Sequence, residues 1–138
     1  MRLKLPSHMI FHHDLGLMIF RPRGVLTKKR VDKDIAFLEL AEDKAQRPFN
    51  RFTDLSEADV TRLQFQDVFK ISLHRRLKYK KGPSVKSAFY VTDEEAARIV
   101  KTHALLTNYS PLVVKMFEEL PAAAKWLGVS MEDLQIGR

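Results

Sequence analysis

Short apolar runs alternate with helical periodicity along this chain. The runs "HMIFHH" and "GLMIFRPRG" are joined through "DLG", whose Asp and Gly suit a tight reversal, so residues 8–24 are predicted to form an antiparallel hairpin. Within residues 28–46, apolar side chains recur at steps of three and four, which predicts a helix that ends before Pro48. The stripe comprises Val31, Ile35, Leu38, Ala41 and Ala45.

Two further strand and helix units follow. Residues 49–55 are predicted to be a short strand, and residues 61–82 a helix whose apolar stripe covers the sheet. Residues 85–91 form the next expected strand, and Thr92 with Glu95 has the spacing of a capping box for a helix. The stripe of the 61–82 helix comprises Phe65, Phe69, Leu73 and Leu77.

The last unit completes the fold prediction. Residues 112–117 are expected to be a strand and 118–128 a helix, with Pro121 in its first turn. The order ββαβαβαβα predicts an α/β fold over residues 1–138, in one domain with about four helices. Its sheet is expected to be mixed and four- to five-stranded, the antiparallel hairpin being followed by parallel strands, and residues 130–138 are expected to be a short C-terminal extension.

Composition narrows the chemistry. With 138 residues, 45% of them hydrophobic, the chain has enough apolar content for one core. It has no cysteine, which excludes disulfides, thiolate nucleophiles, zinc-thiolate sites and iron-sulfur clusters. The first apolar run is interrupted by Pro6, His8 and Asp14, so neither a signal peptide nor a membrane-spanning helix is expected there. We expect a soluble, cytoplasmic protein.

The positive charge is concentrated in one segment. The chain carries a net charge of +7, and residues 68–92 contain seven bases and no acid. The bases are Lys70, Arg75, Arg76, Lys78, Lys80, Lys81 and Lys86. This segment predicts either a surface for an anionic partner or an ordinary solvated helix face.

The order of motifs resembles the SpoIIAA-like branch of the STAS domains over roughly residues 17–129. In that family a strand runs out into an Asp-hydrophobic-Ser turn, here Asp54, Leu55 and Ser56, and a later alanine-and-valine strand matches residues 88–91. The closing Phe strand, Ala-rich helix and Trp-Leu pair correspond to Phe117, Ala122 to Ala124, Trp126 and Leu127. The resemblance implies a STAS-like fold and a regulatory, non-enzymatic role.

The chain departs from the family at the phosphoacceptor. Antagonists of anti-sigma factors carry a phosphorylatable Ser in an Asp-Ser-Ser-Gly segment at the start of the next helix, and the matching place here reads "DVTRLQFQD". Leu63 lies near the acceptor position, and the nearby hydroxyl of Thr61 is expected to cap the helix. A phosphoserine switch is therefore not expected.

The Asp54 to Thr61 turn is the first candidate site. Ligands of open α/β sheets gather at the carboxyl ends of parallel strands, where Asp54 and Ser56 are predicted to lie, while Phe49 and Phe52 point away from solvent. The alternative is that the Asp54 and Ser56 side chains only cap their own turn.

No catalytic or metal constellation is recognised. His12 and His13 are adjacent on a predicted strand and so face opposite sides, and His103 on an apolar helix face is expected to be a hydrogen-bonded core or boundary residue. We expect no enzyme activity, no cofactor and no metal site. A hydrolase or transferase using Asp54, Ser56 or His103 requires at least two of these residues within hydrogen-bond reach in a cleft.

The second candidate site is the basic face of the 61–82 helix. Lys70, His74, Lys78 and Lys81 are spaced as one stripe beside the apolar one, and Ile71 and Tyr79 are expected to add exposed apolar contact. The predicted binding residues of both sites are Asp54, Ser56, Thr61, Lys70, His74, Arg75, Arg76, Lys78 and Lys81.

Two hypotheses of function follow. The first is a binding module for a protein partner or a small amphipathic or anionic ligand, held near the Asp54 to Thr61 edge and the basic helix. The alternative is a binder of nucleic acid or an anionic membrane through residues 70–86, which salt weakens. A homodimer through the edge of the opening hairpin is a further expectation.

Overall fold

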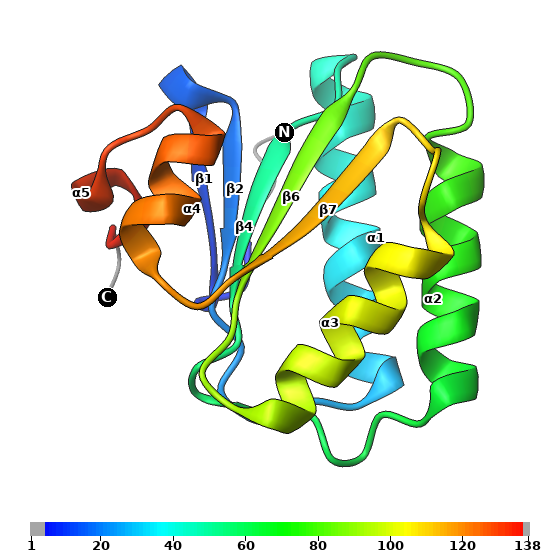
Figure 1. The fold of residues 1–138 in the computed structure, drawn as a ribbon. Coiled ribbons are helices and arrows are strands. Elements are labelled where there is room, and N and C mark those ends of the chain that lie inside the picture. The colour runs from blue at the N-terminus through cyan, green and yellow to red at the C-terminus, as the bar shows by residue number, and fades with distance from the viewer. Residues whose placement is uncertain (1–4, 137–138) are drawn as a thin grey trace.

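The computed structural model describes residues 5–136 as a single α/β domain built on a five-stranded sheet (Figure 1). The strands lie in the order β1-β2-β4-β6-β7. The predicted fold class is confirmed. Two short segments lie outside the described residues. Residues 1–4 belong to the N-terminal stretch in which neither a signal peptide nor a membrane-spanning helix was predicted, and residues 137–138 end the predicted C-terminal extension.

The opening hairpin is confirmed. Strand β1 (Met9–His12) pairs antiparallel with β2 (Leu17–Phe20), with Met9 opposite Phe20 and His12 opposite Leu17. A single 3-10 turn, η1 (His13–Leu15), reverses the chain and ends at Gly16, whose φ of 59° is a left-handed conformation that glycine adopts without a Cβ clash. His13 therefore lies in the turn and not on the strand.

Three parallel strands extend the sheet from β2. They are β4 (Asn50–Asp54), β6 (Val85–Tyr90) and β7 (Leu112–Phe117), and each pairs with the strand before it. Helices α1 (Lys28–Ala45), α2 (Phe65–Lys78) and α3 (Glu94–Leu106) connect them. A second sheet of two short parallel strands, β3 (Gly24–Val25) and β5 (Ala58–Asp59), was not predicted.

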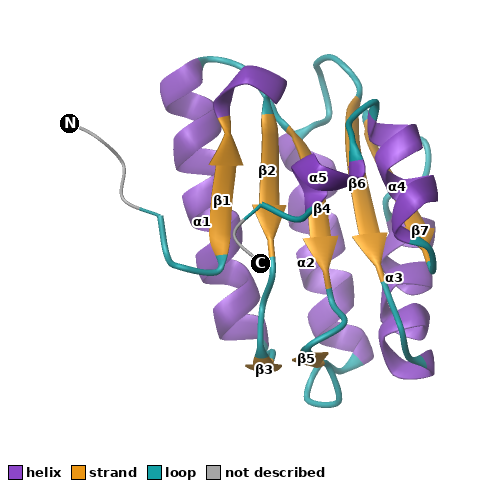
Figure 2. Ribbon diagram, turned by 90° about the vertical axis from the view of Figure 1, so that its left-hand side faces the viewer, coloured by secondary structure: helices purple, strands orange, loops and turns teal. Residues whose placement is uncertain are grey.

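Helices cover both faces of the main sheet. Helices α1, α2 and α3 lie on one face, and α4 (Leu120–Leu127) with the short α5 (Met131–Leu134) lies on the other (Figures 1 and 2). The α4 face buries Ile19, Phe52 and Ala88 of the sheet against Ala123 and Leu134. The predicted C-terminal extension is therefore part of the core as far as Leu134, which is 1% exposed.

Helix starts follow local capping. Pro121 lies in the first turn of α4, as predicted, where its missing N–H removes no helical hydrogen bond. The predicted capping box at Thr92 is wrong by one residue, because Asp93 is the N-cap of α3 and accepts a hydrogen bond of 2.8 Å from the backbone N–H of Ala96. Gln64, and not Thr61, caps α2.

The orientation of α2 differs from the prediction. The stripe expected to cover the sheet faces outward, since Phe65 is 65% exposed and Leu77 60% exposed. The buried face carries Val68, Ser72 and Arg75 instead. The physical reason is hydrogen bonding. On the inward face, Ser72 bonds to His103 and Arg75 bonds to Tyr79, and apolar side chains at these two positions would leave those buried partners unpaired.

No helix in residues 5–136 is long and apolar enough to cross a membrane.

Candidate ligand-binding cavity

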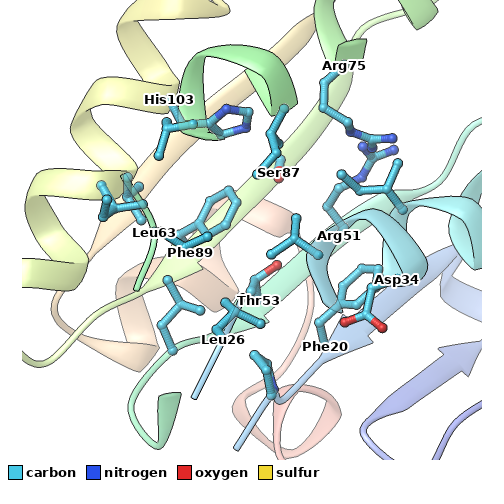
Figure 3. A pocket seen from close by; sticks show the side chains of 18 of the residues that line it. Phe20, Leu26, Asp34, Arg51, Thr53, Leu63, Arg75, Ser87, Phe89 and His103 are labelled. Carbon is cyan, nitrogen blue, oxygen red and sulfur yellow. The ribbon is translucent and has the colours of Figure 1, made fainter. Parts of the chain in front are cut away.

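A cavity of about 140 Å³ lies between the sheet and helices α1, α2 and α3 (Figure 3). Its wall is mainly apolar, and the side chains come from strands β2, β4, β6 and β7, from helices α1, α2 and α3, and from the connecting loops. Phe20, Leu26, Leu38, Leu63, Val68, Phe89 and Val100 form much of this wall. Leu55 and Val60, which lie within the predicted Asp54 to Thr61 turn, also line the cavity.

Half-buried side chains of α1 and α2 form part of the cavity wall. Val31 and Ile35 on α1 and Ile71 on α2 line the cavity and are only half-buried. Asp34 stands beside them and accepts a bond of 2.7 Å from His8 Nε2. Ile71, expected to be exposed, is thus part of the cavity wall.

A buried polar network closes the end of the cavity opposite the Leu55 side. Arg51 is the second residue of β4 and is 3% exposed. Its Nη2 donates bonds of 3.0 Å to Glu42, to the Phe49 carbonyl and to Tyr79. Tyr79 in turn donates to Glu42. Burial raises the pKa of Tyr79, so this hydroxyl stays protonated and remains a donor.

Arg75 joins the same network from α2. Its Nη2 donates to the Tyr79 hydroxyl at 3.3 Å and its Nη1 to Glu39 at 3.4 Å. Both guanidinium groups lie 5.0 Å from the centre of the Tyr79 ring, one from the sheet and one from the helix. Arg75 is therefore a buried residue of the cavity wall, and its predicted place on the exposed basic face is wrong.

Within residues 5–136, two nitrogen atoms of the Arg51 guanidinium are unpaired hydrogen-bond donors. Within the part of the chain that the structure describes, its Nε and Nη1 have no hydrogen-bond partner although both are buried. Burial lowers the pKa of Arg51, and the neighbouring charge of Arg75 lowers it further. Arg51 thus has two unpaired N–H groups and lines the cavity beside the hydroxyl-bearing Thr53 and Ser87 (Figure 3).

His103 lines the cavity from α3. Its Nδ1 lies 2.7 Å from the Ser72 hydroxyl, and its ring meets Phe89 edge-on at 5.8 Å. Burial lowers the pKa of His103 to about 4, and Arg75 and Arg51 add to the shift, so the imidazole is neutral at pH 7. The prediction of a hydrogen-bonded core histidine is confirmed.

The Asp54 and Ser56 side chains serve their own turn. Asp54 Oδ1 accepts bonds from the Ser56 N–H at 2.9 Å and from the Ser56 hydroxyl at 2.6 Å. Asp54 also lies 4.0 Å from Arg21 Nε, and Arg21 reaches the carbonyls of Leu134 and Ile136 at the end of the chain. Since alternate residues of a strand face opposite sides, Asp54 lies on the α4 side of the sheet, away from Arg51 and Thr53.

Thr61 also acts locally. Its hydroxyl donates a bond of 2.6 Å to Asp59 Oδ1, and the two bonds from Thr61 lower the pKa of Asp59. The cap predicted for Thr61 is therefore wrong. Leu63, near which the resemblance led us to expect a phosphoacceptor position, is 6% exposed and lines the cavity.

The remaining predicted basic residues lie on the surface. Lys70, His74, Arg76, Lys78 and Lys81 are exposed. His74 and Lys78 pair with acids of α1, Glu39 at 3.0 Å and Asp43 at 3.3 Å. Tyr79, predicted to be exposed beside them, is 6% exposed.

Catalytic and metal constellations are not assembled in residues 5–136. No group of three or more His, Asp or Glu side chains in that range could hold a metal ion. His103 and the Asp54 to Ser56 pair lie on opposite faces of the sheet, and Ser72, the hydroxyl that does reach His103, is fully buried.

Sequence reasoning missed Arg51, Glu42, Tyr79 and Ser87 as site residues. One signal was available: Arg51 stands two residues after the buried Phe49, on the same face of a predicted parallel strand. A buried arginine requires partners, and the helix acids are the nearest source of them.

In comparisons with protein-family models, curated proteins and solved structures, no match to this chain was found. The resemblance to the SpoIIAA-like STAS domains accordingly stays an expectation based on the sequence motifs.

Proposed function

We propose that this chain is a non-enzymatic binding module of STAS-like type that holds a small amphipathic ligand in the cavity between the sheet and α1 to α3. The observation that carries the proposal is Arg51. A guanidinium with two unpaired N–H groups in a mainly apolar cavity is the arrangement that receives one polar head group and an apolar body.

The head group is an anion, best a carboxylate. Arg51 and Arg75 lie on either side of one tyrosine ring, and the charge of Arg75 adds to the effect of burial in lowering the pKa of Arg51. A carboxylate oxygen that accepts one of the two unpaired N–H groups of Arg51 forms a charge-assisted hydrogen bond, and its negative charge offsets this repulsion.

The volume limits the ligand. A cavity of 140 Å³ is close to one that accommodates benzene, so the ligand has about six to ten non-hydrogen atoms. Medium-chain fatty acids and single-ring carboxylic acids have this size.

A binding role is also supported by the hydroxyl groups. Ser72 has no exposure to solvent, and the hydroxyl of Ser56 is engaged by Asp54 on the other side of the sheet. Thr53 and Ser87 line the cavity, but in the described part of the chain no His, Asp or Glu side chain is hydrogen-bonded to either hydroxyl to activate it as a nucleophile. A cytoplasmic location and a regulatory role remain predictions from the sequence.

Calorimetric titration with hexanoate and hexanol tests the proposal, because the two probes share a chain length and differ in the head group. We expect hexanoate to bind at least about tenfold more tightly, which corresponds to one charge-assisted interaction. Ile35→Phe introduces a ring into the cavity and should abolish binding, whereas Leu40→Phe, on the exposed side of α1, should not. Equal affinity for the acid and the alcohol, or unchanged binding in Ile35→Phe, would contradict the proposal.

A further inference from the structure

An apolar row runs along the outward face of α2. Phe65, Phe69, Leu73 and Leu77 are all exposed, and the rings of Phe65 and Phe69 lie 6.4 Å apart. These residues follow at steps of four over the whole helix, which spans about 21 Å. Exposed large apolar side chains in contiguous rows mark interaction surfaces, whereas isolated ones do not.

The row continues onto the end of α3. Leu105 is 74% exposed and Tyr109 95% exposed. Leu77, Lys80 and Tyr109 together line a hollow at this end of the surface. The apolar surface thus extends across two elements, and α2 with α3 forms the outer layer of this side of the molecule (Figure 1).

Basic side chains border this row. Lys70 follows Phe69, Arg76 precedes Leu77, and Lys80 and Lys81 follow the end of the helix, all of them exposed. Residues 68–92 contain no acid, so no carboxylate of this segment neutralises them. An outward apolar row with a basic border is the pattern of a helix that lies in the interface of an anionic bilayer.

From this charge complementarity we infer that the outward face of α2 docks on anionic lipid membranes, with the apolar row inserted at the level of the acyl chains and the bordering bases at the head groups. The occupant is a bilayer and not a second copy, because two copies of this face bring like charges together. Nucleic acid is disfavoured because phosphate contacts make no use of four exposed apolar side chains. This inference concerns the outer face of α2 and is independent of the ligand proposed for its inner face.

Vesicle flotation of the full chain provides the test, with phosphatidylcholine vesicles containing about one quarter phosphatidylglycerol and with pure phosphatidylcholine vesicles. We expect at least tenfold more protein on the anionic vesicles. Phe69→Gln with Leu73→Gln should reduce that binding about tenfold or more, and Lys70→Gln with Lys80→Gln should weaken it and its salt dependence. Leu15→Gln, an equally conservative change of an exposed apolar residue in the hairpin turn, is the matched control and should leave binding unchanged.

Three outcomes overturn the inference. The first is no preference for anionic vesicles, and the second is full vesicle binding by the Phe69→Gln, Leu73→Gln variant, which would show adsorption by charge alone. The third is a wild-type dimer in light scattering that the same double variant converts to a monomer, because the row would then be covered by a second copy. Unchanged circular dichroism and urea unfolding of each variant establish that a lost signal is not lost folding.

Discussion

Acidification should destabilise this protein through His103 before most carboxylates protonate. The imidazole is buried against Ser72 and Phe89 and faces two arginines, and its pKa is about 4 in the folded state against 6.5 for the ordinary group. Between pH 6.5 and about pH 4, His103 is therefore protonated in the unfolded chain but stays neutral in the folded chain. The free energy of unfolding is unaffected above this window and falls as the pH drops through it.

The size of the effect follows from the two pKa values. The linkage relation gives a loss of about 2 kcal/mol at pH 5 and about 3 kcal/mol at the acid end of the window. Against a total stability of about 5–15 kcal/mol for a domain of this kind, the loss is large enough to measure.

Urea unfolding, followed by circular dichroism at pH 7, 6 and 5, tests this expectation. In His103→Gln the amide can still bond to Ser72 but does not titrate, so the variant should lose about 2 kcal/mol less than the wild type between pH 7 and 5. His74→Gln, at an exposed position, controls for removal of a histidine. If wild type and His103→Gln lose the same stability over this range, the burial of a neutral imidazole is refuted.

Two further predictions test the orientation of α2 and the buried network by urea unfolding. Leu73→Gln should change the free energy of unfolding by no more than about 0.5 kcal/mol, because the side chain is exposed, while Phe52→Ala in the core should cost about 3–5 kcal/mol. A large loss in Leu73→Gln would place the apolar row in the core after all. Glu42→Ala should cost about 3–5 kcal/mol, since it leaves Arg51 and Tyr79 without their shared carboxylate, and a neutral result would contradict the network.

Much of the fold was predictable from local pattern. The hairpin, the three parallel strands and α1, α3 and α4 were confirmed, because each has a continuous apolar run or a periodic stripe bounded by turn residues. Strands β3 and β5 were not predicted because each has only two residues, which is too short to show an alternation of apolar and polar side chains. The start of α3 was misplaced because Thr92 and Asp93 are both good N-cap residues, and the backbone decides between them.

The site was much less predictable, and α2 shows why. Its Phe and Leu residues have the spacing of an amphipathic helix. The face that turns inward is nevertheless the one with Arg75, because Arg75 and the following Tyr79 bond to residues of α1 and β4 that are distant in sequence. A helical period identifies a stripe but does not say what the stripe faces. The volume of the cavity depends on the spacing of three helices above the sheet, which no single segment encodes.

The strand order has a consequence for synthesis of the chain. Strands β2, β4, β6 and β7 lie side by side in chain order, with α1 to α3 on one face. Among the described residues, the helices that cover the other face lie within residues 120–134. A growing chain that has reached β7 therefore presents the apolar surface of Leu17, Ile19 and Phe52 to its surroundings, and this is the kind of surface that aggregates or recruits chaperones. Among the described elements the α4 to α5 segment is thus the last to cover the sheet, and we expect a chain interrupted before it to be an early target for quality control.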